Sequence, residues 1–439
     1  MTENWKQSVI SRKFPSTFYD TRFRMVSQWI LGKQQEDDAE GLWRIKDSLY
    51  DFSDFISRHP GGRFWLETTR GTDITEAFEI HHISIIPENM INKFKIRDAK
   101  EPRNITLTLN DDGFYKTLKK RVRDKLKSID YHPSSRSDLL HTGLLLATFL
   151  TAIMSVILNS NFMTIIASFL LCWTVISSHN YFHRRDNWRM YCFNLGLMNV
   201  NDWRISHALS HHIYTNSFHD LEISMFEPYF MWIPNPYVKT AFQRYGSWIY
   251  GPLIYVSLFP MSFIKRIIFS LKKQNVFYYD DIIAFTLPLA MYLTTGGTLY
   301  IVLKTWILII LGASFIFSLI GLNAAHHHPD IHHDGDVMRS DRDWGLFQLD
   351  TVIERADFKN SHFFTLTHFG DHAMHHLFPT LDHGILPQLY PILYDTMEEF
   401  NGELRECSQL HHFIGQHKQL ARIEANPIPR DEIIKSKKK

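Results

Sequence analysis

Long apolar runs begin only after residue 138 of this chain. Residues 139–158 hold no Asp, Glu, Lys or Arg, and this length is about what crosses the hydrocarbon core of a bilayer. A second run, 161–178, follows after a connection short enough only for a tight hairpin. Further apolar stretches lie at 247–264, 282–297 and 305–325. We expect 139–158, 161–178, 282–297 and 305–325 to span a membrane. The remaining stretch, 247–264, is interrupted by Pro252 and Pro260 and is expected to lie in the membrane–water interface.

The segments outside these runs are polar and differ from one another in composition. The acidic run QQEDD (34–38) is typical of a solvated linker, and the basic, helix-prone stretch 116–130 stands just before the first span. The pattern predicts a polar segment (1–40), a compact soluble domain (41–105), a basic linker (106–138), a membrane domain (139–400) and a cytosolic tail (401–439).

The basic residues before the first span predict its orientation. Lys and Arg accumulate on the cytosolic side of short loops, so the first hairpin should start in the cytosol. Two hairpins of two spans each return the chain to that side. Both termini and all the histidine groups described below are therefore expected on the cytosolic face.

Composition narrows the class of protein. Basic and acidic side chains nearly balance, 47 against 46, so no charge excess points to nucleic acid. Three cysteines without close spacing argue against a disulfide framework and for a reducing compartment. The N-terminus lacks the apolar stretch of a signal peptide, and the tail KSKKK resembles a retrieval signal of the endoplasmic reticulum. We expect a multi-pass protein of that membrane. The unusual feature is the number of histidines, 25.

The soluble domain carries a histidine at a rigid turn, in His59-Pro60-Gly61-Gly62. Glycine lets the backbone approach a bulky ligand closely. A pair of histidines, His81 and His82, follows about two dozen residues later. Two imidazoles that reach one ligand from opposite sides could both coordinate a haem iron. The candidates for an apolar wall are Phe52, Phe55 and Phe78.

This stretch resembles the cytochrome b5 family. The shared pattern is an aromatic–Asp pair, Phe, HPGG, G-x-D-x-T-x-x-F and then His, within residues 41–100. The resemblance implies a small α+β domain that binds haem b, with His59 and His82 as axial ligands. His81 stands beside His82 as the alternative, and the gap is one residue shorter than in the free-standing cytochrome. An acidic set around this site would either steer a basic reductase or keep the domain soluble. It comprises Glu67, Asp73, Glu76, Glu79 and Glu88.

The other histidines stand in groups beside the span ends. Their spacings of three and four residues place side chains on one helical face, so each pair can direct two nitrogens at one point. Imidazole suits zinc, copper and iron, and eight or more imidazoles are too many for one tetrahedral zinc. Two metal ions are therefore expected, and the lack of carboxylates at ligand spacing excludes a Glu-rich di-iron bundle. The groups are His179 and His183; His207, His211 and His212; His326, His327, His328, His332 and His333; and His372, His375 and His376, flanked by His368 and His383.

The pattern H-x3-H, H-x3-HH, H-x2-HH resembles the three histidine boxes of membrane fatty acid desaturases and hydroxylases, over about residues 139–400. The resemblance implies an all-α membrane di-iron domain with about four transmembrane helices plus cytosolic helices. A ninth ligand is expected before the third box, where His327 is the first choice and His326 and His328 are rivals. The implied ligands of the two non-haem irons are His179, His183, His207, His211, His212, His327, His372, His375 and His376.

Two departures from the family pattern leave the position of the reaction open. Front-end desaturases, which also carry a cytochrome b5 domain, have Gln as the first residue of the third box, where this chain has His372. The second box is H-x3-HH rather than H-x2-HH. The fused architecture therefore does not define which bond reacts.

These resemblances imply an oxygen-dependent lipid oxidoreductase. Iron would activate O2 with electrons delivered through the haem, most simply to desaturate an acyl chain of a fatty acid or sphingolipid. The implied partners are a lipid or acyl-CoA substrate, O2, and NADH-cytochrome b5 reductase as electron donor. The alternatives are hydroxylation at the same site and a haem electron carrier with a non-catalytic di-iron domain. Because separate segments build the haem and iron sites, we expect the two to assemble independently.

Overall fold

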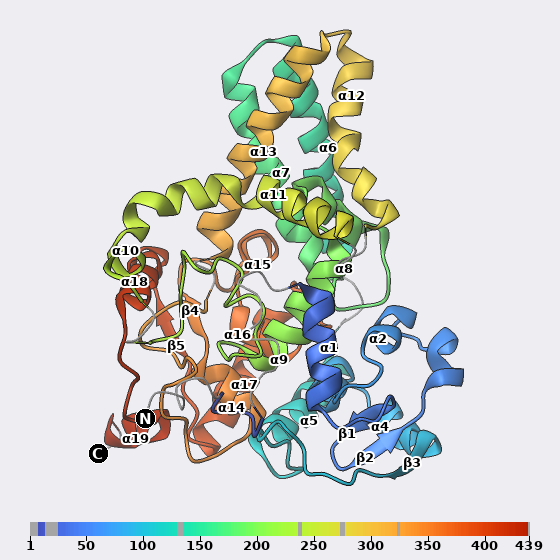
Figure 1. The fold of residues 1–439 in the computed structure, drawn as a ribbon, viewed down its shortest axis with the longest axis vertical. Coiled ribbons are helices and arrows are strands. Elements are labelled where there is room, and N and C mark those ends of the chain that lie inside the picture. Colours follow the sequence, from blue (N-terminus) through green and yellow to red (C-terminus); the bar gives the residue numbers. More distant parts are fainter. Residues whose placement is uncertain are drawn as a thin grey trace.

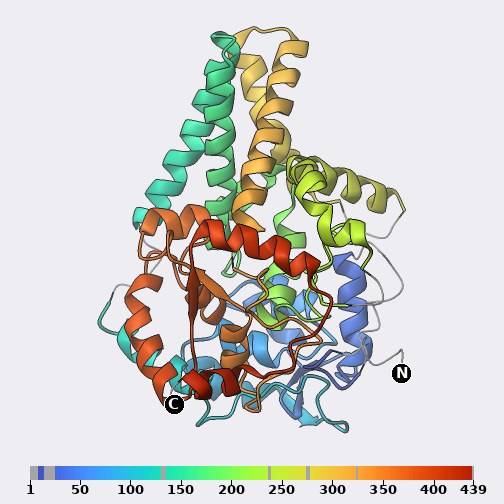
Figure 2. The same ribbon diagram turned by 90° about the vertical axis from the view of Figure 1, so that its left-hand side faces the viewer.

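The computed structural model describes residues 8–13, 25–129, 135–235, 239–272, 277–322 and 325–437 (Figure 1). A column of helices stands at one end of the molecule, and a rounded body that contains both chain ends forms the other (Figures 1 and 2). A small domain with a β-sheet lies on one side of this body, next to helix α1 (Val26–Glu36).

The small domain has the predicted α+β fold. Three short antiparallel strands lie in the order β1-β2-β3. Trp43 from the sheet is fully buried, and its indole N–H donates to the Leu66 carbonyl at 3.0 Å, which ties the first strand to the helical part. The elements are β1 (Trp43–Ile45), β2 (Ser48–Tyr50), β3 (Lys95–Asp98), α2 (Arg63–Thr68), α3 (Thr75–His81), α4 (Ile86–Met90) and the 3₁₀ segments Ser53–Arg58 and Ile91–Phe94.

Four helices of the described residues are long and apolar enough to cross a membrane, which makes this a multi-pass membrane protein. Three of them, α6 (Ser135–Ile157), α7 (Asn161–Ser178) and α13 (Leu299–Gly321), contain or overlap predicted spans. The fourth is α11 (Ser247–Leu271), the stretch that was expected in the interface. The helix continues through both of its prolines, so these residues do not interrupt it.

The predicted span 282–297 is built differently. It comprises the end of a 3₁₀ segment, Tyr279–Phe285, and the ten-residue helix α12 (Thr286–Thr295), which is short for a span by length alone. Both views nevertheless place α12 in the column with α6, α7 and α13, whereas α11 runs across the base of the column (Figures 1 and 2). The path of the chain through a bilayer stays a prediction.

The body contains segments that the sequence pattern treated as linker and tail. Helix α5 (Phe114–Leu126), within the predicted linker 106–138, buries Phe114, Tyr115 and Leu118 in the main core, and the Tyr115 hydroxyl donates to the Leu377 carbonyl at 3.1 Å. In the predicted tail, β5 (Arg405–Cys407) pairs in parallel with β4 (Ile353–Arg355). The other helices of the body are α8 (Val200–Trp203), α9 (His212–Tyr214), α10 (Ala241–Tyr245), α14 (Trp344–Asp350), α15 (His362–His368), α16 (His372–Leu377), α17 (Tyr390–Glu399), α18 (Gln409–Ala421) and α19 (Arg430–Lys437).

The acidic run 34–38 is not a solvated linker. It belongs to the end of helix α1, where Lys33 and Asp37 form a buried ion pair of 2.8 Å. The Trp29 indole N–H of the same helix donates to the His219 carbonyl at 2.8 Å. Helix α1 therefore joins the small domain to the body, while residues 1–7 and 14–24 of the predicted polar segment lie outside the described residues.

Most of the acidic set of the small domain is buried in ion pairs. Arg103 pairs with Asp73 and Glu76, each at 2.7 Å, and Lys119 of α5 pairs with Glu79 at 2.7 Å. Burial raises the pKa of the Glu79 carboxyl, but the positive charges of Lys119 and Lys116 have the larger effect, so the pKa is lowered. The Glu79–Lys119 pair joins the small domain to α5 of the body, whereas the pairs of Arg103 lie within the small domain. These three carboxylates are buried and therefore are not part of the acidic surface that the sequence predicted.

We expect Glu79→Gln to destabilise the protein by roughly 3 kcal/mol, because the buried Lys119 ammonium would keep only the partly exposed Glu88, at 3.1 Å, as its ionic partner. The thermal unfolding midpoint in detergent measures the effect. Glu67→Gln is the matched control, since Glu67 forms an exposed pair with Arg63 that contributes about 0.5 kcal/mol or less. Equal midpoints for the two variants would contradict a structural role for the buried pair.

Candidate functional site

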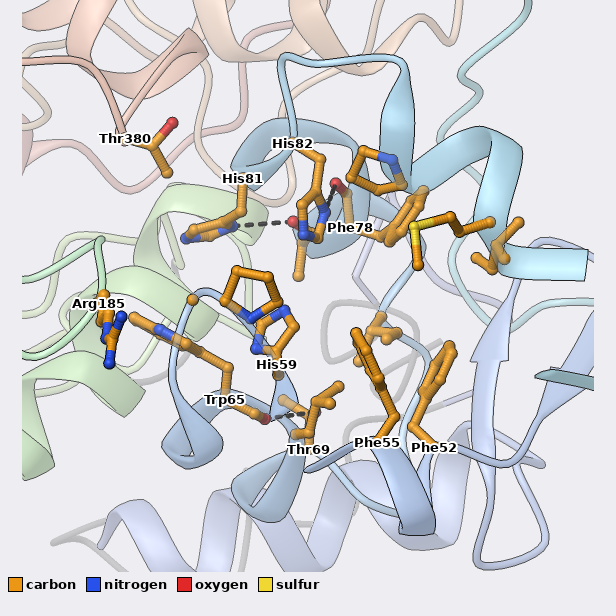
Figure 3. Close-up of a pocket in the computed structure, with 18 of the residues that line it drawn as sticks. Phe52, Phe55, His59, Trp65, Thr69, Phe78, His81, His82, Arg185 and Thr380 are labelled. Atoms are coloured by element: carbon orange, nitrogen blue, oxygen red, sulfur yellow. Dashed lines mark hydrogen bonds between the residues drawn. The ribbon is translucent and has the colours of Figure 1, made fainter. Parts of the chain in front are cut away.

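The small domain encloses a largely apolar cavity of about 460 Å³ in which two histidines face each other (Figure 3). The ring centroids of His59 and His82 are 6.1 Å apart. His59 donates from Nδ1 to the Gly62 carbonyl at 2.8 Å, and His82 donates from Nδ1 to the Phe78 carbonyl at 2.9 Å. Because a carbonyl only accepts, both protons are fixed on Nδ1 and each Nε2 keeps a free lone pair.

The two glycines of the HPGG turn permit this arrangement. A Cβ on Gly61 would lie 2.9 Å from Cε1 of His59, so a side chain there would displace the ring. Gly62 has φ of +97°, a conformation that other residues rarely adopt. The turn therefore holds Nδ1 of His59 against the Gly62 carbonyl and leaves Nε2 without a hydrogen bond to the turn.

His81 takes a different direction from its neighbour. Its Nδ1 donates to the Ala77 carbonyl at 2.8 Å, and its side chain points away from the space between His59 and His82 (Figure 3). Burial lowers the pKa of both His81 and His82 to about 4, so both rings are neutral at physiological pH. The residues fit a haem: two imidazoles face each other across an apolar cavity. Metal–nitrogen bonds of about 2 Å leave room for one metal atom between them.

A second site, in the body, gathers nine buried histidines into two adjacent groups. In each group the candidate ligand nitrogens all lie within 4.8 Å of one another. The first group is His179, His183, His207, His212 and His375, and the second is His211, His326, His372 and His376. Eight of the nine ligands predicted from the sequence are thus brought together, and the ninth is not.

His326 rather than His327 joins the second group. Nε2 of His326 lies 2.8 Å from Nε2 of His372 and 3.0 Å from Nε2 of His376. The ring of His327 points elsewhere and stacks on Trp232, with ring centroids 3.7 Å apart. Three successive histidines cannot be distinguished by spacing alone, and the packing of Trp232 decides between two of them.

The second histidine box lies on a π-helix, Arg204–His211, which continues into α9. A π-helix closes its hydrogen bonds five residues apart, so residues five apart share a face. Nε2 of His207 and Nε2 of His212 accordingly meet at 3.0 Å. His211, which the spacing paired with His207, belongs to the second group and also forms a third group with His207 and Glu222. The extra residue of this box, H-x3-HH, fits the wider turn.

The third box divides in the same way between the two groups. His372 and His376 are four residues apart on α16 and belong to the second group, while His375 belongs to the first. Nε2 of His375 lies 3.1 Å from Nε2 of His179. The pairing predicted for His372 and His375 is therefore wrong, since a spacing of four aligns side chains on an α-helix better than a spacing of three.

Oxygen atoms behind the rings fix the tautomers of several histidines. Nδ1 of His207 lies 2.8 Å from Glu222, and Nδ1 of His211 lies 2.9 Å from Asp220. Such partners orient metal-binding imidazoles and increase their basicity. Sequence reasoning missed both carboxylates, although the run HDLE directly after the second box was a signal. Burial opposes protonation of His211, but Asp220 and Glu222 outweigh it and raise its pKa to about 9.

The facing nitrogens provide a test of whether metal ions fit. His326 donates from Nδ1 to the Thr351 carbonyl at 3.0 Å, and His376 from Nδ1 to the Gln348 side-chain oxygen at 3.2 Å. Their Nε2 atoms, 3.0 Å apart, then both carry lone pairs and repel each other unless a cation lies between them. Burial lowers the pKa of both histidines well below the usual value, which disfavours a proton as that cation. The donor set fits transition-metal ions.

Two adjoining cavities lie beside this site, near helix α11. The space beside the histidines is small, about 70 Å³, and His211, Glu222 and His372 are among the residues that line it. A larger, mostly apolar cavity of about 510 Å³ is lined by residues of α11. The two spaces share four lining residues, Trp203, Met225, Phe226 and Leu258. An apolar chain bound in the larger cavity could thus reach the histidine groups.

Comparison with known proteins agrees with both sites. The family model of fatty acid desaturases matches residues 155–408, and that of the cytochrome b5-like heme/steroid binding domain matches residues 30–100. A cytochrome b5-related protein of Drosophila melanogaster is 57% identical, over 97% of this chain and 98% of the relative. The Delta(5) fatty acid desaturase A of Dictyostelium discoideum is 24% identical, over 86% of this chain and 90% of the relative.

A third relative, the acyl-lipid (8-3)-desaturase of Mortierella alpina, is 23% identical over 81% of this chain and 87% of the relative. The desaturase model covers more than half of the chain and contains all nine grouped histidines. The chain therefore belongs to the fatty acid desaturase family and carries a cytochrome b5-like domain on the N-terminal side of its desaturase domain.

Proposed function

We propose that this protein is a membrane-bound, oxygen-dependent lipid oxidoreductase that desaturates the acyl chain of a fatty acid or sphingolipid. The observation that carries the proposal is the pair of buried histidine groups next to an apolar cavity. A site of this kind suits a reaction on an unactivated hydrocarbon chain, for which a dry, apolar surrounding and a strong oxidant are both needed.

Two non-haem iron ions would be held by the two groups. We assign one to His179, His183, His207, His212 and His375, and the other to His211, His326, His372 and His376. When bound, they would supply the activation of O2. Glu222 and Asp220 hold His207 and His211 in one tautomer, and Thr351 does the same for His326, so these rings are oriented in advance.

The shape and lining of the cavities support an acyl substrate. Phe226 and Leu258 line both spaces and exclude water from the path between them. Helix α11 lies at the base of the helical column, so a chain that leaves the bilayer there enters the larger cavity directly (Figure 1). The carrier of the acyl group is a lipid or acyl-CoA.

Electrons would enter through haem b, held by His59 and His82. Both Nε2 atoms are free to coordinate iron, because each Nδ1 is engaged by a backbone carbonyl. NADH-cytochrome b5 reductase is the proposed donor to this haem. We place the protein in the endoplasmic reticulum membrane, with both termini, the haem and the iron site on the cytosolic side.

The choice of ninth ligand predicts a difference between two adjacent residues. His326→Ala should lose non-haem iron and reduce activity at least about tenfold, because a ligand is lost. His327→Phe, which keeps a ring for Trp232, should retain both. Elemental analysis of purified protein, corrected for haem iron, measures the metal. Iron lost from the His327 variant alone would reverse the assignment.

The reaction itself predicts a change in membrane lipids. Cells that express the protein should accumulate an acyl chain with one additional double bond, and cells that express His375→Ala should not. Mass spectrometry of total lipids, with the carriers separated, identifies the product. A hydroxylated chain would instead establish the hydroxylase alternative, and identical lipids in both strains would contradict an oxidoreductase role.

The electron route and the location can be tested together in sealed microsomes. NADH added outside the vesicles should reduce the haem and support turnover, since the proposed haem site and reductase face the cytosol. His59→Ala should lack the haem spectrum, keep its non-haem iron and lose NADH-dependent turnover. Activity that appears only after the vesicles are permeabilised would contradict the proposed orientation.

A further inference from the structure

The cavity of the cytochrome b5-like domain is closed partly by the desaturase domain. Besides His59 and His82, its lining includes His183, Arg185 and Thr380 from the body. Figure 3 shows Arg185 and Thr380 on the side of the cavity where His81 lies. The two candidate cofactor sites are therefore direct neighbours, although their histidines come from separate segments of the chain.

His81 lies between the two sites. Its ring centroid is 6.1 Å from that of His183, a member of the first histidine group, and the two rings are inclined by only 32°. His81 is also bonded through the backbone to His82, the ring that faces His59. A short path through space therefore runs from His82, at one side of the haem cavity, through His81 to His183 in the first histidine group.

Three ring nitrogens along this path make no hydrogen bond among the described residues. Nε2 of His81 is buried without a hydrogen-bond partner among the described residues, and the same holds for both nitrogens of His183. Nδ1 of His81 is engaged by the Ala77 carbonyl, which fixes the ring.

The domain interface around His81 is held rigidly. The Arg204 guanidinium lies 4.9 Å from the ring centroid of Trp65, and Trp65 packs on His81 with centroids 5.4 Å apart. Arg204 starts the π-helix of the second box and also donates from Nε to the Phe182 carbonyl, next to His183. One arginine thus contacts the surroundings of both rings and keeps them at a fixed separation.

We propose that His81 is a positioning residue for electron transfer, whose ring bridges the haem cavity and the metal centre. This inference rests on the proposed function. His59 and His82 would hold the haem, which when bound would supply one electron at a time: as it passed from ferrous to ferric, one ferric ion held by the histidine groups would become ferrous. A one-electron donor, the flavoprotein reductase or an artificial photoreductant, would restore the ferrous haem for the second electron.

The test uses the full-length protein in lipid nanodiscs with both cofactors bound. A flavin photoreductant delivers one electron to the haem in the absence of O2, and absorbance then follows haem reoxidation by the metal centre. His81→Leu removes the ring and should abolish the fast phase of reoxidation. His81→Phe keeps a ring and should restore most of it. Haem spectrum, haem reduction potential and iron content should stay at the wild-type values in both variants.

A matched control removes another buried histidine. His412 of α18 is buried with both nitrogens unpartnered among the described residues, and it belongs to neither site. His412→Leu should reoxidise its haem like the wild type. Wild-type kinetics in His81→Leu, or equal rates in the Leu and Phe variants, overturn the proposal. Loss of haem or iron in both variants also overturns it, since His81 would then be structural.

Failure of the electron bridge can be distinguished from failure of the proposed desaturase function. If the wild-type protein forms no lipid product but its haem reoxidation depends on the ring at position 81, the electron bridge stands and the proposed function fails. If the protein desaturates lipid but the metal centre does not reoxidise the wild-type haem, electrons enter elsewhere and the bridge fails.

Discussion

Lone pairs that converge in a buried space constrain the whole desaturase domain. Nine imidazoles are directed into one site, and their facing nitrogens approach as closely as 2.7 Å, as for His179 and His207. A buried polar group without a partner costs about 1–3 kcal/mol, so nine of them would consume much of the stability of an ordinary domain. Positive charge at the centre relieves this cost.

This constraint accounts for the elements around the site. The three boxes come from the segment directly after α7, from a π-helix with its continuation α9, and from α16, and none of these segments alone supplies either group. The surrounding carboxylates and carbonyls set the tautomers, so that lone pairs rather than N–H groups face inward. The apolar cavity along α11 ends where the rings begin, which brings a hydrocarbon surface next to a polar centre.

Buried charge also determines where the cytochrome b5-like domain is attached. Lys119 of α5 pairs with Glu79 across the interface, while the pairs Arg103–Asp73 and Lys33–Asp37 lie within the small domain and within α1; all three pairs are largely excluded from solvent. Such pairs are weak sources of stability compared with apolar packing but specific in geometry, because a misplaced partner leaves a buried charge alone. The result is a domain held in one orientation, with His81 next to His183.

The sequence by itself determined the α+β domain with its HPGG turn, the apolar runs and eight of the nine grouped histidines, since these depend on local spacing and residue type. Local spacing did not distinguish His326 from His327, nor divide the boxes between two groups, because a π-helix and the stacking of Trp232 redirect the rings. The docking of α1, the partners Asp220 and Glu222, and the contact between His81 and His183 depended on the tertiary structure. They join segments far apart in the chain through buried charges and packing, and the direction of a lone pair is fixed only when the groups around it are in place.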